Sequence, residues 1–239
     1  MVQYVPDKTG RFARRPHYKP QELDRECESI VSTFLRSRYG KAEFPVSTDD
    51  ITRLIEQDAD DLDLYADLSE FGPDVEGVTE FRLGKKPLVK IASYLSEDER
   101  RENRLRTTLT HEYGHVRFHA YLWEIEPPQH DFLKKNPNAN KQICKRDDIL
   151  NAAQYDWMEW QAGYACGAFL MPMTHVQRIA GAYQQSHNLF GPVPHNSDDG
   201  RRLIEEISTG FQVSTEAARV RLAKLGFLGD VAPSLSLFS

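Results

Sequence analysis

Hydrophobic residues recur at helical spacing in several segments of the chain, and these segments predict most of its secondary structure. Residues 20–39 read as an amphipathic helix that Gly40 ends, and a short helix follows at about residues 48–55. A capping-box pattern at residues 96–99 predicts the start of a long helix that runs to about Tyr121. Further helices are predicted from Asp147 or Asp148 to Pro172, at 173–186, at about 199–209 and at 215–225.

Three strand-like segments lie between the second and third of these helices. They fall near residues 62–68, 75–83 and 88–93, and Gly72-Pro73 and Gly84 punctuate them as turns. Their short connections favour a small antiparallel sheet. The sequence therefore predicts an α+β fold, in which this sheet packs on the long helix and the remainder is mainly helical.

The composition is that of an ordinary globular protein. The 239 residues are 40% hydrophobic and 28% charged, with a net charge of −6 that argues against a generally basic nucleic-acid binder. Three cysteines are too few, and odd in number, for a disulfide framework, so a reducing compartment is expected. No segment reads as a signal peptide or a membrane span, which predicts a cytoplasmic protein without a membrane partner.

Three parts are expected along the chain. Residues 1–40 form a basic N-terminal arm and the first helix, and residues 41–190 form the core, with a Pro/Asn/Lys-rich loop insertion at about 125–147. Residues 191–239 contain a helical pair, similar to a helix-turn-helix, and a loose tail. The arm reads as irregular, and its basic and aromatic residues fit either a solvated surface or a phosphate-binding segment.

The residues that carry chemistry are His111-Glu112-Tyr113-Gly114-His115, an HExxH motif on the long predicted helix. Histidines four residues apart lie on one helix face, about 6 Å apart along the axis, so both rings can reach one zinc ion. Glu112 projects about 100° away around the helix. It can therefore miss the ion yet act as general base on a water molecule beside it.

A catalytic zinc ion takes three protein ligands and keeps one position open. His119 lies about 12 Å along the axis from His111, too far to bind the same ion, so a packing or supporting role is expected. Glu159 is the better third ligand, because it lies in an otherwise apolar or small face of the next predicted helix. A carboxylate buried there needs a partner, which a metal ion would provide. Asp156, one turn earlier, could orient a ligand histidine or lie on the surface.

Two segments, HEYGH and EWQAGYACGAFLMP, resemble the ImmA/IrrE family of zinc metallo-endopeptidases, which are gluzincin-like. Glu159, Ala162 and Pro172 keep the family's offsets, and the C-terminal FQVSTEAARVRLAKLGFL resembles its usual ending. The likeness covers about residues 45–228. It implies that His111, His115 and Glu159 bind Zn²⁺, that Glu112 is the catalytic base, and that the fold is a zincin-type one.

The same resemblance implies cleavage of a DNA-binding helix-turn-helix repressor, which derepresses a stress, mobile-element or anti-phage defence operon. Two departures stand out. The Ala-Asn pair usual after the glutamate is Ala162-Gly163 here, and 43 residues separate His115 from Glu159. Neither departure removes a ligand. The insertion could shape a substrate cleft or regulate access to it.

Regulation and the remaining catalytic group are open at the level of sequence. Tyr155, Tyr164 and His175 are candidates for the residue that stabilises the oxyanion. Cys144, in a basic part of the insertion, is either an exposed loop cysteine or a thiolate that fills the open zinc position and holds the enzyme latent. Single-stranded DNA exposed by damage is a candidate activator that the basic segments could sense.

Two other functions fit parts of the sequence. One is a non-enzymatic helix-turn-helix DNA-binding regulator with a structural zinc ion, and the other is a zinc hydrolase that acts on a small molecule. Structural zinc sites usually have four protein ligands, often cysteines, whereas three ligands and a well-placed acid are found here. The sequence therefore favours the peptidase, which would bind an extended substrate beside a sheet edge.

Overall fold

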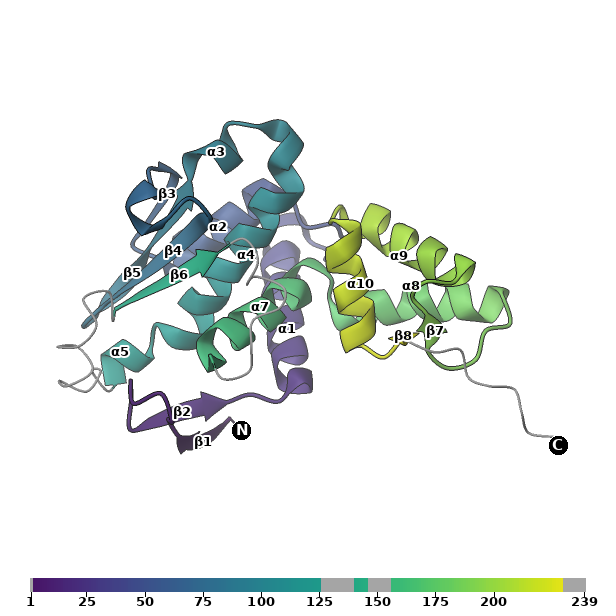
Figure 1. The fold of residues 1–239 in the computed structure, drawn as a ribbon, viewed down its shortest axis with the longest axis horizontal. Coiled ribbons are helices and arrows are strands. Elements are labelled where there is room, and N and C mark those ends of the chain that lie inside the picture. Colours follow the sequence, from purple (N-terminus) through teal and green to yellow (C-terminus); the bar gives the residue numbers. More distant parts are fainter. Residues whose placement is uncertain (1, 126–139, 146–155, 230–239) are drawn as a thin grey trace.

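The computed structural model describes residues 2–125, 140–145 and 156–229 of the 239-residue chain. Helices make up most of it, and a small sheet flanks them on one side (Figure 1). Among the described residues, no helix combines the length and the apolar character needed to cross a membrane. The longer helices are α1 (Pro20–Tyr39), α2 (Thr48–Asp58), α4 (Glu102–His119), α7 (Trp157–Leu170), α8 (Met173–Ser186), α9 (Asp198–Phe211) and α10 (Thr215–Lys224).

In the described part of the chain, the main sheet has four strands in the order β3-β5-β4-β6. They are β3 (Asp61–Ala66), β4 (Val75–Arg82), β5 (Lys85–Ala92) and β6 (Lys141–Lys145). Strand β4 pairs antiparallel with β5 and β6, whereas β3 runs parallel to β5. The prediction of a small antiparallel sheet is therefore confirmed for β4 and β5 but wrong for β3, which skips its neighbour in sequence and pairs in parallel with the far strand of the β4–β5 hairpin. The α+β class is confirmed.

The long motif-bearing helix begins later than predicted. Residues 93–96 form the short helix α3 (Ser93–Ser96), and the 3-10 turn η2 (Glu99–Arg101) precedes α4. Asp98 has an extended backbone (φ −124°, ψ 102°), which separates the two turns, and its side chain caps η2 by accepting from the amide of Arg100. Asp98 of the predicted capping box therefore caps the turn η2, and α4 starts only at Glu102.

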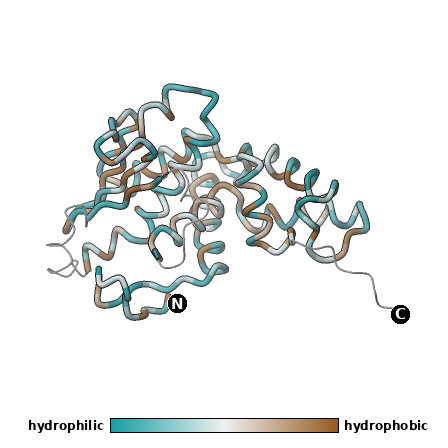
Figure 2. The backbone as a smooth tube through the Cα atoms, in the orientation of Figure 1, coloured by the Kyte–Doolittle hydropathy of each residue, from teal (hydrophilic) through white to brown (hydrophobic). Residues whose placement is uncertain are grey.

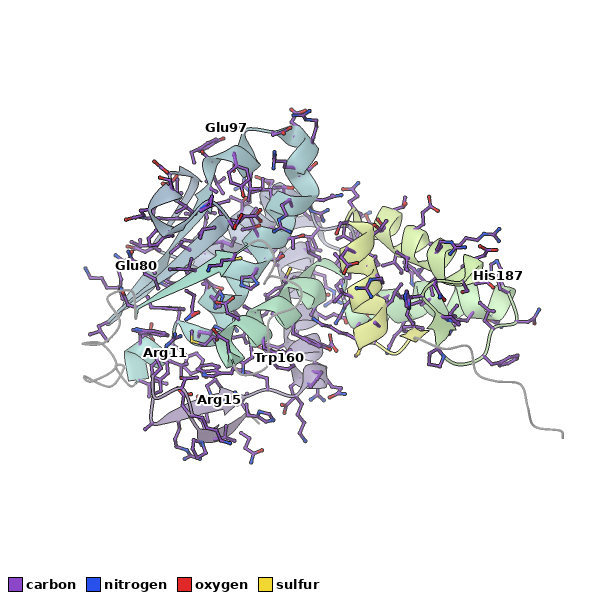
Figure 3. The ribbon with its side chains drawn as sticks, viewed as in Figure 1. Arg11, Arg15, Glu80, Glu97, Trp160 and His187 are labelled. Carbon is purple, nitrogen blue, oxygen red and sulfur yellow. The ribbon has the colours of Figure 1, made fainter. Side chains whose placement is uncertain are left out.

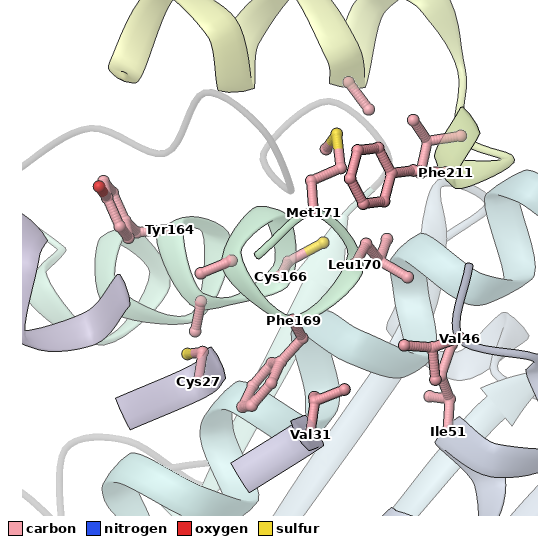
Figure 4. Packing of buried hydrophobic residues seen from close by; sticks show 14 of the residues in the cluster. Cys27, Val31, Val46, Ile51, Tyr164, Cys166, Phe169, Leu170, Met171 and Phe211 are labelled. Atoms are coloured by element: carbon pink, nitrogen blue, oxygen red, sulfur yellow. The ribbon is translucent and has the colours of Figure 1, made fainter. Parts of the chain in front are cut away.

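Helix α4 is the centre of the molecule. It packs against the sheet on one side and against α2 and α7 on the other, and α1 covers α7 from outside (Figure 1). Hydrophobic residues gather where these elements face one another, and the outer turns are hydrophilic (Figure 2). In the core, Phe169 and Cys166 of α7 lie beside Cys27 and Val31 of α1 (Figure 4). Burial on nearly all sides explains why α7 is apolar around most of its circumference.

The basic N-terminal segment is an ordered hairpin, which corrects the prediction of an irregular arm. Strand β1 (Gln3–Pro6) pairs antiparallel with β2 (Arg14–His17). The connecting loop buries Phe12, which is 1% exposed, edge-on against Trp123 with ring centroids 4.9 Å apart. Aromatic burial of this kind is worth a few kcal/mol. The aromatic residue of the arm therefore anchors it to the core.

The C-terminal helices form a group at one end of the molecule (Figure 1). Helix α9 packs against both α8 and α10, so this group begins at α8, before residue 191. A buried ion pair joins it to the first helix: Arg221 of α10 lies 2.7 Å from Asp24 of α1, and both are at most 2% exposed. Within this group, the two-residue strands β7 (Val193–Pro194) and β8 (Leu228–Gly229) pair in parallel.

Several segments with sequence-based predictions lie outside the described residues. They are most of the insertion, the proposed helix caps Asp147 and Asp148, the candidate Tyr155, and most of the expected tail. Within the insertion, residues 141–145 form β6 instead of a loop. The insertion therefore contributes an edge strand to the main sheet.

A prediction concerns the close contact of α4 with α7. A Cβ atom at Gly114 would lie 3.0 Å from Ala162 Cα, closer than ordinary packing allows. Gly114→Ala should destabilise the protein by about 1–3 kcal/mol through overpacking, measured by urea unfolding. Gly181→Ala in α8, where a Cβ would meet no atom within 4 Å, is the matched control and should gain up to about 1 kcal/mol of helix propensity. Equal effects of the two substitutions would contradict the packing argument.

Candidate metal centre

Three side chains from two helices converge in the interior between α4 and α7. His111 Nε2 lies 3.0 Å from Glu159 Oε2, His115 Nε2 lies 3.3 Å from Glu159 Oε1, and the two histidine Nε2 atoms lie 3.1 Å apart. Both histidines are 0% exposed and Glu159 is 8% exposed. The structure thus brings together the three residues that the sequence singled out as ligands.

The spacing of these atoms fits a tetrahedral metal ion. Ligands about 2.0–2.1 Å from one zinc ion in tetrahedral geometry lie about 3.3 Å from each other. The distance between the two Nε2 atoms, and the distance from each of them to its nearest oxygen of Glu159, fall close to this value. Two imidazole nitrogens and one carboxylate also form a donor set that suits zinc. The residues present therefore fit a catalytic zinc ion with one open position.

Glu112 lies beside these ligands but is held by the sheet. Its Oε2 accepts a hydrogen bond from Thr79 Oγ1 of β4 (2.5 Å), whereas its buried Oε1 has no hydrogen-bond partner among the described residues. Gly77 lies on the same face of β4 as Thr79. It leaves room for the Glu112 side chain, since a Cβ atom at Gly77 would overlap the carboxylate. Burial raises the pKa of Glu112, and the nearby His115 and His111 oppose this shift. A carboxylate with one unpartnered oxygen and a raised pKa suits a proton acceptor.

His119 supports His115 from behind. Its Nδ1 lies 3.0 Å from Nδ1 of His115, and its Nε2 lies 3.0 Å from Oε1 of Gln161. Gln161 also donates from Nε2 to the carbonyl of Pro16 in β2 (3.0 Å), which orients its amide. His119 must then donate to Gln161 and accept from His115, because burial and the neighbouring His115 lower its pKa well below the usual value and keep it neutral. This leaves the Nε2 lone pair of His115 for a metal.

Electrostatics stabilise a negative Glu159 in this centre. Burial works against the charge, but His115 and His111 hold the pKa of Glu159 well below its usual range. Burial likewise opposes protonation of His115, yet Glu159 and Glu112 raise its pKa. The Asp156 carboxylate caps α7 by accepting from the amide of Glu159 (3.4 Å). Asp156 therefore positions the start of α7 and makes no hydrogen bond to His111 or His115.

A second group contacts Glu159 from the sheet and the N-terminal hairpin. With its amide oriented to satisfy both neighbours, Gln142 of β6 donates to Glu159 Oε1 (2.8 Å) and accepts from the Arg11 guanidinium. Arg11 comes from the loop between β1 and β2 and extends toward α7 (Figure 3). Burial lowers its pKa, and the carboxylates of Asp156, Asp7 and Glu159 oppose that shift. A basic residue of the arm thus lies near the metal centre.

Cys144 is close to the centre but differs from both descriptions offered by the sequence. It is 1% exposed on β6, and its Sγ lies within 4.8 Å of ligand atoms of His111 and Glu112. Lys141 and Lys145 alternate with it onto the other face of the strand. Burial and the carboxylates of Glu112 and Glu159 raise its pKa well above the usual value. It is neither an exposed loop cysteine nor a thiolate created by basic neighbours.

The described candidates for oxyanion stabilisation lie elsewhere. Tyr164 donates its hydroxyl to Asp24 (2.8 Å) in the interface with α1. His175 faces the Phe44 ring, with centroids 4.5 Å apart, near the C-terminal helices. Tyr155 falls outside the described residues. Neither described candidate reaches the metal centre.

Four residues that support the centre were not identified from sequence. Thr79 and Gln142 lie on strands whose inward face is apparent only once the register is known, and Gln161 lies on a helix buried on nearly all sides. Arg11 belongs to the basic arm, where its charge suggested a surface role. Burial alternates along β6, whereas the first five residues of β4 are all buried, so alternation identifies an inward face on β6 alone and names no partner.

A prediction follows from the support that His119 provides. His119→Ala should weaken zinc binding about 10–100-fold, because His115 loses the acceptor that fixes its tautomer. Competition with a chelating dye would measure the affinity. His119→Asn, whose amide oxygen can replace the accepting nitrogen, should restore most of it. An unchanged affinity in the alanine variant would show that the contact is only packing.

Comparison with known proteins agrees with the geometry of this centre. The model of the IrrE N-terminal-like domain, of peptidase family M78, matches residues 80–223, more than half of the chain. The matched segment includes the helices α4 and α7 that carry the three converging side chains. No curated protein matches the chain significantly. The chain belongs to the family of IrrE N-terminal-like peptidase domains.

Proposed function

We propose that the protein is a zinc-dependent endopeptidase that cleaves a DNA-binding helix-turn-helix repressor. One observation carries the proposal. His111, His115 and Glu159 converge at metal-ligand spacing, and Glu112 is held beside them with one oxygen unpartnered among the described residues. Membership of a peptidase family supports the same activity. The packing of α4 against a small sheet is what a zincin-type fold requires.

In the proposed mechanism each residue has a separate task. His111, His115 and Glu159 would hold the zinc ion, which would supply Lewis acidity for activating a water molecule and polarising the scissile carbonyl. Glu112 accepts the proton of the attacking water and then delivers it to the leaving amine. Thr79 keeps the carboxylate in place, because its hydroxyl bonds the oxygen that does not take part.

The repressor is the proposed substrate because of the family likeness, and its cleavage would derepress a stress, mobile-element or anti-phage defence operon. We infer that the reaction takes place in the cytoplasm. Cys27, Cys144 and Cys166 are all free and buried, as suits a reducing compartment. Cys144 is retained as a candidate inhibitory zinc ligand, since its sulfur lies close to His111 and Glu112.

Single-stranded DNA is proposed as an activator, bound at the N-terminal hairpin. A cavity of about 290 Å³ there is lined by basic Arg15, His17 and Lys19 and by Trp157 and Trp160. The Arg15 guanidinium lies 5.5 Å from the centroid of the Trp157 ring, and Figure 3 labels Arg15 near Trp160. Cations for phosphates and aromatic rings for bases form a common single-strand site.

The alternative is a non-enzymatic, zinc-stabilised helix-turn-helix regulator that binds DNA itself. It is less well supported, because α10, the second helix of the C-terminal pair, has few cations available for DNA. Arg221 is buried against Asp24, and Arg219 pairs with Glu216 at 2.7 Å. The buried Glu112 also has no task in a purely structural zinc site.

The catalytic role of Glu112 gives a direct prediction. Glu112→Gln should bind zinc as wild type does but lose at least about 10²-fold in cleavage of the neighbouring-gene repressor, because the general base is gone. A gel assay with the purified repressor would measure cleavage, and metal analysis would measure zinc. Glu99→Gln, an exposed acid just before α4, is the matched control and should cleave normally. Retained turnover in the Glu112 variant would remove this residue from the mechanism.

The DNA site gives a second prediction. Arg15→Ala should weaken binding of single-stranded DNA and reduce the slope of log affinity against log salt by about 1, because one phosphate contact is lost. Fluorescence anisotropy at several salt concentrations would measure both. Arg14→Ala removes the neighbouring charge, whose guanidinium donates to the Tyr4 carbonyl, and should have a smaller effect. Binding without salt dependence would contradict the proposed site.

A further inference from the structure

Strand β6 occupies the edge of the sheet that lies next to the catalytic residues. Among the residues that the structure describes, it pairs only with β4, in the register Gly77↔Cys144 and Thr79↔Gln142. Those two β4 residues are the ones that face Glu112: Thr79 bonds it and Gly77 makes room for it. The edge of β4 is therefore the part of the sheet closest to the site of cleavage.

Two inward side chains of β6 reach residues of the candidate metal centre. Gln142 bonds Glu159, and the Cys144 sulfur lies within 4.8 Å of ligand atoms of His111 and Glu112. The strand therefore covers the centre from the side of the sheet. His111, Glu112 and His115 are each 0% exposed, so a peptide has no access to them in this arrangement.

An endopeptidase needs its substrate in an extended conformation beside the metal. Extended peptides commonly achieve this by adding a strand to a sheet edge, where main-chain hydrogen bonds supply affinity. The edge of β4 that faces away from β5 can pair with only one strand at a time. A strand from the insertion already makes those bonds across the catalytic centre.

We propose that β4 is the substrate-binding strand and that β6 is an internal occupant of its edge, which an extended segment of the substrate replaces in the same antiparallel register. The inference rests on the proposed peptidase function and adds the surface on which the substrate binds. The 43 residues between His115 and Glu159 accordingly supply a competitor for the substrate. In this arrangement the enzyme is latent, and catalysis requires β6 to leave β4.

A reversible crosslink between the two strands tests the proposal. Glu80 and Lys141 are directly opposite, and the adjacent pair is hydrogen-bonded, with the Phe81 amide donating to the Asn140 carbonyl (2.7 Å). The Glu80–Lys141 pair is therefore of the closer, non-hydrogen-bonded type, which suits a disulfide. The double variant Glu80→Cys/Lys141→Cys would be assayed for repressor cleavage when oxidised and after reduction with a phosphine.

The oxidised variant should bind zinc but cut at least about tenfold more slowly than its own reduced form, because a fixed β6 blocks the edge of β4. The single variants Glu80→Cys and Lys141→Cys should not respond to the redox change. Equal cleavage by the oxidised and reduced forms would overturn the proposal, since the substrate would then bind with β6 in place, for example on its outer edge.

A second measurement needs no enzymatic activity. Alkylation of the native cysteines, followed by mass spectrometry, should modify Cys144 at least about tenfold faster than the buried Cys166 and Cys27, because local release of β6 exposes it. The oxidised crosslink should remove this difference. Equal rates for all three cysteines would overturn the proposal. Fast labelling of Cys144 in a protein that cuts no repressor would support β6 release and count against the proposed function alone.

Discussion

The whole centre depends on how closely α4 and α7 approach each other. Gly114 of α4 lies against Ala162 of α7, so near that even a methyl group would meet Ala162 Cα at 3.0 Å. Ala162 is one turn after Glu159, and Gly114 is next to His115. The contact therefore sets the distance between the carboxylate and the two imidazoles. Glycine and alanine recur on α7, and α4 has Gly114 at the contact, because a larger residue there would separate candidate ligands that must lie about 3.3 Å apart.

Other elements support this helix pair from two directions. The N-terminal hairpin holds Gln161 through the carbonyl of Pro16, and Gln161 in turn orients His119 behind His115. On the opposite side, the sheet holds Glu112 through Thr79 and contacts Glu159 through Gln142. Segments far apart in sequence thus determine which atoms face the candidate metal site. A centre of this kind combines ligands on rigid helices with supporting hydrogen bonds from neighbouring elements.

Much of the fold and the core of the site could be predicted from local patterns. The ends of α1 and α8 follow from amphipathic spacing and from breakers such as Gly40, and the positions of His111, Glu112 and His115 on one helix follow from their spacing alone. Glu159 could be selected because a carboxylate on an apolar face needs a partner. These inferences succeed because helix geometry relates sequence spacing directly to distance.

The parts that could not be predicted depend on long-range pairing. The parallel pairing of β3 with β5 and the strand formed by residues 141–145 require partners that no local pattern identifies. The burial of Arg11 and Phe12 depends on where the hairpin docks. Cys144 was assessed by its charged neighbours in sequence, yet alternation along β6 turns Lys141 and Lys145 away and leaves the thiol facing carboxylates.

The zinc affinity of Glu159→Gln, measured by competition with a chelator, tests directly whether the three side chains bind one ion. We expect one tightly bound ion per chain in the wild-type protein. The variant should lose more than the roughly 10–100-fold expected for a supporting residue, while its circular dichroism spectrum stays unchanged. An affinity equal to that of the wild type would show that the carboxylate of α7 is not a ligand, and the proposed three-residue centre would be wrong.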